Sequence, residues 1–407
     1  MIHAALARRL AAAAFTAVLA ALPIVAFAQD ANTVRPDVGK ALQAAQALSK
    51  SGKHKEALAK VNEADAVSGK SAFETYTIQR TRGSIAAAAG DNDTAAKAFE
   101  AVIASGRAPA AENLRMIQAV AGLYYRGKDY PKAATWAARY QKDGGNDPSM
   151  RTLLVQSHFL ANDCGAVSKI VGEGGEGARK PTEEELQILA NCYLKQKDNS
   201  GYVSAIERLV LFYPKKDYWT DLLNRVQKKN GFSDRLSLDV YRLKLATGNI
   251  STPNDYLEMA QLALQAGFPT EAKKVVEKGY AAGALGTGKD AERHKRLKDL
   301  ADKTASELRG ARAQAEKDAA ADKAGNALVA IGYNYVTEGA AEKGLGLIDQ
   351  GIKKGGLKRP EDAKLLFGIA QVQNGQRARG MQTLKGVQGA DGTADLARLW
   401  LLIAQRG

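Results

Sequence analysis

The stretch "ALVAIGYNYVTEGAAEKGLGLIDQG", residues 327–351, is repeated in outline by "KLLFGIAQVQNGQRARGMQTLKG", residues 364–386. Small and apolar residues recur between the two at a constant offset of 36 positions. The first copy has Gly332, Gly339, Gly344 and Ile348, and the second has Gly368, Gly375, Gly380 and Leu384. Similarity at a fixed period of this length indicates a repeat fold, in which each repeat is one small structural unit.

The same spacing occurs elsewhere in the chain: a small residue, Gly seven positions on, Ala or Gly five further, and an apolar residue four further. Its other members are Ala45, Gly52, Ala57 and Val61; Gly83, Gly90, Ala95 and Phe99; and Ala260, Gly267, Ala272 and Val276. This spacing predicts a hairpin of two helices, because small residues let the helices approach closely and Gly permits the turn.

These positions resemble the tetratricopeptide repeat (TPR) family. The positions that carry the resemblance are Leu328, Ile331, Gly332, Tyr335, Gly339, Gly344, Ile348 and Gly351. The resemblance implies an all-α, right-handed α-solenoid. Apolar residues are spaced three and four apart throughout, and the period-2 alternation of strands is absent, so the residues themselves also predict helices.

We expect about ten hairpins and a C-terminal capping helix near 393–405. The hairpins are expected at 38–68, 73–105, 112–143, 149–172, 183–213, 218–248, 253–283, 292–322, 325–356 and 361–388. The eighth has Leu308 where the turn glycine belongs, so one continuous helix through Gly310 is an open alternative. The stretch "GEGGEGARKP", residues 172–181, is the hinge candidate.

Residues 1–28 have the pattern of a signal peptide: Arg8 and Arg9, an uncharged apolar run, and Ala26-Phe27-Ala28 before the cleavage point. The alternative is an uncleaved membrane anchor. A linker at 29–36 and the solenoid at 37–407 are expected to follow. No later stretch has the uncharged length of a membrane helix, so we expect a soluble periplasmic protein without a membrane span.

The formal net charge is +14 for the whole chain, which could indicate a nucleic-acid partner. The basic residues alternate with acidic ones, as in "AERHKRLKDLADK", and this is typical of solvated helix faces. We therefore expect no nucleic-acid partner.

The stretch "GALGTGKD", residues 283–290, matches a P-loop except that Asp290 stands where Ser or Thr is needed. A P-loop follows a strand, whereas this stretch follows a predicted helix, so no nucleotide site is expected. His54, His158 and His294 lie far apart in the sequence, and we expect His54 and His294 on solvated surfaces. The sequence therefore predicts no metal, no cofactor and no enzyme activity.

The partner-binding surface is expected on the first helix of each hairpin, which the TPR resemblance places on the concave side. The outward positions are Gln118, Tyr125, Arg126, Gln187, Asn191, Lys195, Thr220, Asn224, Gln261, Gln265 and Tyr333. Amide side chains both donate and accept hydrogen bonds, so they can bind the backbone of an extended peptide. The alternative is a groove that is merely solvated.

Other aromatic residues are expected to be structural. Tyr124, Tyr193, Tyr256, Tyr335 and Trp219 are expected to pack between hairpins, and Trp400 to cover the last hairpin.

The two cysteines, Cys164 and Cys192, lie at the turn of the fourth hairpin and in the first helix of the fifth. Two cysteines in an oxidising compartment are commonly paired, so we expect a disulfide. Two separate buried thiols are the alternative.

Three segments resemble periplasmic TPR proteins that accompany TonB–ExbB–ExbD systems: "ERLVLFYPKKDYW" (207–219), "YLEMAQLALQAGFPTEAKKVVEKG" (256–279) and "IKKGGLKRPEDAKLLFGIAQ" (352–371). The resemblance implies a helper of TonB-dependent transport that binds periplasmic or envelope proteins. A scaffold or chaperone in cell-envelope or peptidoglycan assembly, and an enzyme with unrecognised chemistry, are the alternatives.

Overall fold

The computed structural model describes residues 32–172 and 179–406, and every regular element in those ranges is a helix. The chain divides into two compact units. The N-terminal unit extends through Leu154, and the C-terminal unit begins at Val155. The boundary lies inside α7 (Pro148–Leu160).

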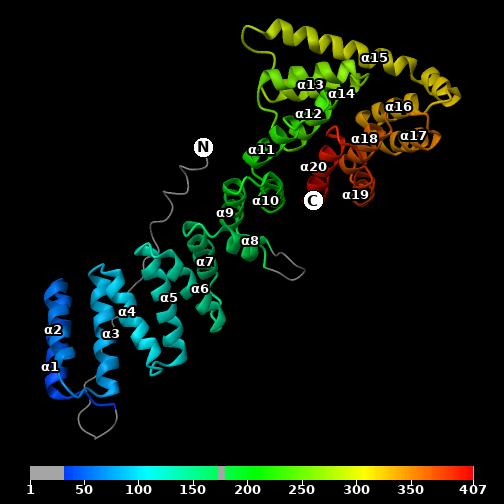
Figure 1. Ribbon diagram of the computed structural model, residues 1–407. Helices are drawn as coiled ribbons and strands as arrows, with labels where there is room; N and C mark the ends of the chain where they lie inside the picture. The colour runs from blue at the N-terminus through cyan, green and yellow to red at the C-terminus, as the bar shows by residue number, and fades with distance from the viewer. Residues whose placement is uncertain (1–31, 173–178, 407) are drawn as a thin grey trace. The chain divides into compact units, whose positions relative to one another are not determined.

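The N-terminal unit contains three hairpins that follow one another along the chain (Figure 1). They are α1 (Pro36–Lys50) with α2 (His54–Ala66), α3 (Ala72–Ala88) with α4 (Asn92–Ala104), and α5 (Ala110–Arg126) with α6 (Tyr130–Lys142). Each hairpin contacts the next through its adjacent helices.

The C-terminal unit continues the pattern. Its helices are α8 (Cys164–Gly172), α9 (Glu183–Lys195), α10 (Asn199–Phe212), α11 (Lys216–Gln227), the 3-10 helix η2 (Asp234–Leu236), α12 (Ser237–Ala246), α13 (Pro253–Gln265), α14 (Pro269–Ala281), α15 (Ala291–Ala321), α16 (Asn326–Glu338), α17 (Ala341–Lys354), α18 (Pro360–Gln373), α19 (Arg377–Lys385) and α20 (Thr393–Arg406).

The repeat spacing has the structural role that the sequence predicts. At Gly332 an added Cβ would lie 2.7 Å from the carbonyl oxygen of Gly344, so the backbones of α16 and α17 meet directly. At Gly368 an added Cβ would lie 2.6 Å from Cγ of Leu384. The turn residues Gly339 and Gly375 have φ values of 103° and 81°, a left-handed conformation that residues with a Cβ rarely adopt.

Side-chain caps help to fix where several helices begin. Ser71 accepts a hydrogen bond from the backbone N–H of Glu74, whose carboxylate accepts one from the N–H of Ser71. Thr182 and Glu185 form the same reciprocal pair at the start of α9. Each pair satisfies two N–H groups that would otherwise lack an intrahelical partner.

The expected all-α fold of paired helices is confirmed, with one correction to the number of hairpins. Residues 291–321 form one 31-residue helix, α15, and not an eighth hairpin. Leu308 stands where a hairpin would have its turn glycine, and the helix continues through Gly310. The structure therefore has the continuous helix that the sequence left as the alternative. The described part of the chain therefore has nine helix pairs, one long helix and a closing helix.

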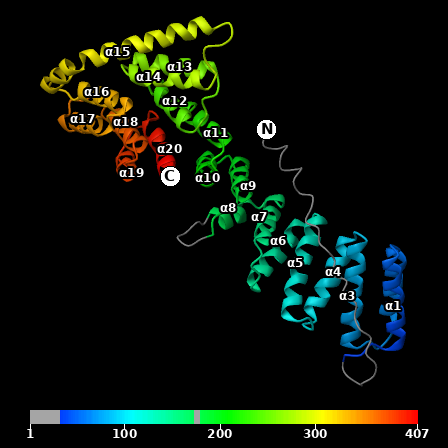
Figure 2. The same ribbon diagram turned by 180° about the vertical axis from the view of Figure 1, so that it is seen from behind.

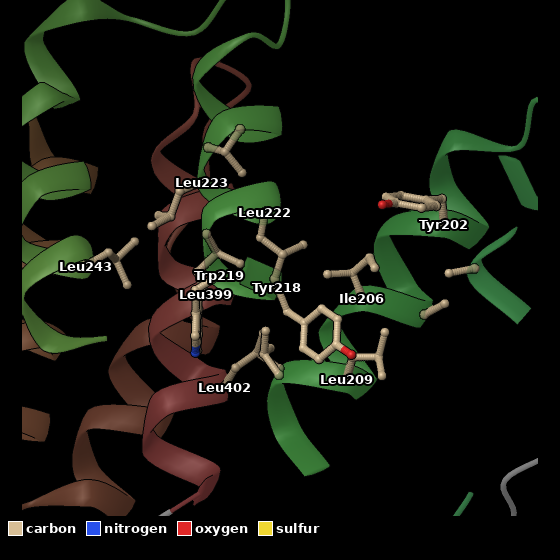
Figure 3. Close-up of a cluster of buried hydrophobic side chains, with 14 of the residues drawn as sticks. Tyr202, Ile206, Leu209, Tyr218, Trp219, Leu222, Leu223, Leu243, Leu399 and Leu402 are labelled. Atoms are coloured by element: carbon tan, nitrogen blue, oxygen red, sulfur yellow. The ribbon is translucent and has the colours of Figure 1, made fainter. Parts of the chain in front are cut away.

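The closing helix α20 does more than cap the last hairpin. It contacts α18 and α19 but also α10 and α12, which precede it by about 150 residues or more, and both orientations of the ribbon show this arrangement (Figure 2). Trp400 and Trp219 are each 1% exposed in one core cluster. Figure 3 labels Trp219 in this cluster together with Leu399 and Leu402 of α20. The C-terminal unit is therefore closed by a contact between its beginning and its end.

Ion pairs strengthen this closure. Arg235 binds Asp362 through Nε and Nη2, both at 2.9 Å, and its Nη2 also donates to Asp391 at 2.6 Å. Nearby, Lys229 pairs with Asp395 at 2.7 Å. Paired Arg–carboxylate bonds are stronger than neutral hydrogen bonds and fix the relative orientation of the two groups.

Several sequence predictions concern residues outside the described ranges. The signal peptide at 1–28 lies wholly outside them, as do residues 173–178 of the hinge candidate and residues 29–31 of the 29–36 linker, whose last residue, Pro36, begins α1. The right-handed winding of the solenoid stays a prediction. None of the helices in the described ranges combines the length and apolar character needed to cross a membrane.

Candidate functional site

The predicted partner-binding residues lie on the first helices of hairpins, as expected, but in two separate units. Gln118, Tyr125 and Arg126 are on α5 of the N-terminal unit. The other eight are on α9, α11, α13 and α16 of the C-terminal unit. Each set is therefore treated as a surface of its own unit.

The three residues on α5 contact other side chains. Gln118 donates from Nε2 to Oδ2 of Asp147 at 2.9 Å. The ring of Tyr125 packs edge-on against Tyr130 with centroids 5.7 Å apart. Arg126 is exposed, and its Nε donates to Asn92 at 3.4 Å. Of these three residues only Arg126 is exposed, whereas Gln118 and Tyr125 are half-buried.

The two amides on α9 are used inside the protein. Gln187 donates from Nε2 to the hydroxyl of Tyr218 at 2.6 Å, and that hydroxyl donates to Glu183. Burial, together with the hydrogen bond to Glu183, raises the pKa of Tyr218 above its usual value. Asn191 donates to the backbone carbonyl of Gln187 at 2.9 Å. These amides therefore join α9 to α11 and stabilise α9.

Lys195 and Thr220 are exposed but also have internal partners. The Lys195 ammonium lies 4.2 Å from the ring centroid of Phe159 and donates to Asn162 at 3.2 Å. Thr220 accepts a hydrogen bond from Asn249 at 2.7 Å. A partner could reach both residues only in competition with these contacts.

Three amides remain exposed without a hydrogen bond to any described residue. They are Asn224 on α11 and Gln261 and Gln265 on α13, the first helices of consecutive hairpins. We refer to these three residues as the amide set. Their donors and acceptors face water, which is the state that backbone recognition of a partner requires.

Tyr333 does not face outward, and this prediction is wrong. The side chain is 1% exposed, its hydroxyl donates to Oε1 of Glu271 at 3.0 Å, and its ring lies edge-on to Phe268 with centroids 4.9 Å apart. Burial raises the pKa of its hydroxyl well above the usual value. The physical reason is that α16 packs on α14, so this position faces another helix.

Tyr333 belongs to a buried charged cluster that sequence reasoning missed. Arg242 forms a two-bonded pair with Glu271 at 2.8 and 2.6 Å, and binds Asp239 at 2.7 Å. The guanidinium also lies 4.7 Å from the ring centroid of Tyr333. Buried charges need such partners. The sequence signal that could have indicated this cluster was the presence of charged residues at positions of α12 and α14 where apolar residues are expected.

The two cysteines form a disulfide in the structure, with their Cα atoms 5.3 Å apart. Cys164 begins α8 and Cys192 lies in α9, and both are buried in the core cluster of the C-terminal unit. The bond therefore joins consecutive hairpins by a covalent link.

The glycine-rich stretch 283–290 connects α14 to α15, so it follows a helix and not a strand. It lines a hollow of about 300 Å³. His294, expected on the surface, lines this hollow and is only 3% exposed, so that prediction is wrong. A second hollow of about 470 Å³ lies beside Tyr193 and Arg208.

The described residues contain no group of three or more His, Cys, Asp or Glu side chains that could hold a metal ion. Of the expected structural residues, Tyr124, Tyr256, Trp219 and Trp400 are buried, whereas Tyr193 and Tyr335 are half-buried. Tyr335 packs between helices through Arg312 and Lys343, whose charged groups lie over its ring.

The sequence matches no protein-family model and no curated protein. Among solved structures the chain is similar to the TPR domain of P58(IPK), with 15% identity, coverage of 91% of this chain and 98% of that chain, and a TM-score of 0.23.

Two further structures show similarity of the same order. The complex of Naa15/Naa10 bound to HypK-THB has 13% identity, covers 91% of this chain and 61% of that chain, and gives a TM-score of 0.30. Yeast Tom70 has 10% identity, the similarity covers 90% of this chain and 95% of that chain, and the TM-score is 0.24. At such low identities and TM-scores these similarities carry no argument about function; the TPR-like repeat fold rests on the helix pairs themselves.

Proposed function

We propose that this protein is a non-enzymatic adaptor that binds an extended segment of a protein partner through the amide set. The observation that carries the proposal is that Asn224, Gln261 and Gln265 are exposed, lie on consecutive first helices, and have no internal hydrogen bond among the described residues. An extended segment has backbone N–H and C=O groups to satisfy, and amides can bind both kinds of group whatever the segment's sequence.

The charge of the protein favours an acidic partner. The chain has 58 Lys and Arg against 44 Asp and Glu, and exposed cations such as Lys228 near the amide set have no ion pair among the described residues. A cationic surface speeds encounter with an acidic partner, while the hydrogen bonds of the amide set fix how the segment lies.

We place this activity in the periplasm. The apolar N-terminal pattern of residues 1–28 supports export, and the Cys164–Cys192 disulfide supports an oxidising compartment. The resemblance of three segments to TonB-associated proteins makes a component of TonB-dependent transport the first partner to test. A scaffold or chaperone in cell-envelope or peptidoglycan assembly is the second candidate.

The experiment begins with affinity capture from envelope extract and identification of the bound protein. The affinity of that partner is then measured for the triple variant N224A/Q261A/Q265A. Because each lost hydrogen bond costs about 1 kcal/mol, the triple variant is expected to bind at least tenfold more weakly, to order of magnitude. Ala is a strong helix former, so the helices remain intact.

Gln350→Ala is the matched control for Gln265→Ala. Gln350 is also an exposed amide with no internal hydrogen bond among the described residues, but it lies on α17, the second helix of its hairpin. The proposal predicts weaker binding for Gln265→Ala alone. Equal affinities for the triple variant and the unchanged protein would show that the partner binds elsewhere.

A further inference from the structure

The hollow of about 300 Å³ beside the glycine-rich connector is lined by both apolar and charged residues. The apolar lining residues are Pro253, Leu257 and Ala284, and the others are Asn254, Thr287, Gly288, Lys289, Asp290, Arg293 and His294. The volume of the hollow is at the lower end of the range for small-molecule sites.

One ring nitrogen of His294 has a hydrogen-bond partner within the described residues and the other has none. Its Nδ1 accepts a hydrogen bond from the backbone N–H of Gly286 at 3.1 Å. In the neutral ring the proton is therefore on Nε2, which has no hydrogen-bond partner among the described residues. The side chain is only 3% exposed and lines the hollow, but Nε2 itself keeps accessible surface. Its N–H is therefore available to a ligand in the hollow that accepts a hydrogen bond.

The hollow also lies at the start of α15, whose 31 residues begin at Ala291. The N-cap residue Asp290 makes no side-chain hydrogen bond to the helix, so the first N–H groups lack the usual side-chain acceptor. The backbone N–H of Ala291 bonds the carbonyl of Gly288 at 3.3 Å, but the partial positive charge of the helix start still favours an anion.

The cations at this helix start differ from those further along α15. Lys289 and Arg293 are exposed and have no ion pair among the described residues. By contrast, Lys295 pairs with Asp299 at 2.7 Å and Lys298 with Asp302 at 2.6 Å. Two cations and the carboxylate of Asp290 leave the charged side chains of the hollow net positive.

We propose that this hollow binds a small organic anion that carries one carboxylate or phosphate group on an apolar body. The oxyanion accepts from Nε2–H of His294 and from the helix start, and pairs with Lys289 and Arg293. The apolar body covers Leu257, Pro253 and Ala284. Asp290 opposes the anion and limits its affinity. This activity is separate from partner binding through the amide set.

Calorimetric titration of the full chain with hexanoate, hexyl phosphate, hexanol and inorganic phosphate tests the proposal. Hexanoate or hexyl phosphate is expected to bind, and whichever binds more tightly identifies the head group. Hexanol lacks the charge and is expected not to bind; inorganic phosphate lacks the apolar body and is expected to bind more weakly than hexyl phosphate. No binding of either organic anion would overturn the proposal, as would hexanol binding as tightly as hexanoate.

Three variants locate the site. Arg293→Gln and Lys289→Gln are each expected to weaken binding of the better organic anion by about two- to fivefold, the effect of one exposed charge pair. Asp290→Asn removes the opposing charge and is expected to tighten binding by a similar factor. Asn is also a good N-cap residue, so the helix start is preserved.

Lys295→Gln is the matched control, because it removes a cation from the same helix outside the hollow. It is expected to change the affinity less than Arg293→Gln does. If Lys295→Gln weakens binding as much as Arg293→Gln, or if Asp290→Asn leaves the affinity unchanged, the anion is attracted by the general surface charge and the proposed site is wrong.

Discussion

The two units are built from the same hairpin but are held together differently. In the N-terminal unit, contacts follow chain order from α1 to α6. In the C-terminal unit, α20 contacts α10 and α12. Arg235 binds Asp362 and Asp391, which follow it in the sequence by 127 and 156 positions. When each repeat contacts only its neighbours, the stability of the stack is roughly the sum of contributions from its repeats. The stability of a closed unit depends in addition on the helix that closes it.

The largest expected effect comes from ending the chain at Gly392, which removes α20. This deletion would expose the apolar cluster that contains Trp219, Leu222 and, on α18, Leu365, so the C-terminal unit should lose its cooperative unfolding transition. The transition of the N-terminal unit should remain. Differential scanning calorimetry measures both.

Removing α1 and α2 is the corresponding change in the N-terminal unit. It should only lower the transition temperature of that unit, because α3 to α6 keep their mutual contacts. The deletion of α20 should therefore destabilise the C-terminal unit more than the deletion of α1 and α2 destabilises the N-terminal unit. Equal losses of stability would contradict the contrast between the units.

The disulfide stabilises only the C-terminal unit. Cys164 and Cys192 are 28 residues apart, and closing a loop of that length is expected to contribute about 3–4 kcal/mol. The double variant C164S/C192S should therefore unfold at lower denaturant in the C-terminal unit alone. Thiol titration of the denatured, unreduced protein should find no free thiol, and finding two would refute the bond.

The glycines at which two helices of a hairpin approach closely allow a finer comparison. An added Cβ at Gly332 would meet backbone atoms of α17, whereas at Gly83 its three nearest atoms would belong to the ring of Phe99, the nearest at 2.6 Å. A side chain can move aside more easily than backbone. Gly332→Ala is therefore expected to cost about 1–3 kcal/mol, and Gly83→Ala less, by chemical denaturation of each variant.

Gly346→Ala is the control, since an added Cβ at this exposed position in α17 meets nothing within 4 Å. It should stabilise the protein by about 0.5–1 kcal/mol, because Ala favours a helix. Equal effects of Gly332→Ala and Gly346→Ala would contradict the close helix contact.

The smallest expected effect is the loss of stability of the C-terminal unit at acidic pH. The hydrogen bond from Thr393 and the guanidinium of Arg235 lower the pKa of Asp391 to about 2, below its ordinary value of 3.8. Because the folded pKa is the lower one, this contribution is complete above about pH 4 and is lost as the pH falls towards 2.

Arg235→Ala should remove part of this acid dependence and lower the stability of the C-terminal unit by about 1–2 kcal/mol at neutral pH. Urea denaturation of both proteins at pH 6 and at pH 3 gives the comparison. An unchanged stability at both pH values would show that Arg235 does not hold the closure.

The sequence predicts local structure well because the repeat spacing is local. Gly332, Gly344 and Ile348 meet within one hairpin, so their spacing carries the information. The return of α20 depends on Arg235, Asp362 and Asp391, which no repeat period relates. Tyr333 was misassigned because the spacing identifies a helix face but not that α14 covers it, and His294 because a charged helix can still bury one side.

Native-state hydrogen exchange on the full chain tests the closed and open arrangements most directly. The amides of α10, α12, α18 and α20 are expected to exchange together at one slow rate, since these helices open only when the C-terminal unit unfolds. The amides of α1 and α2 are expected to exchange faster than those of α3 to α5, as at the end of a stack. Exchange of α20 that is fast and independent of α10 would contradict the closure.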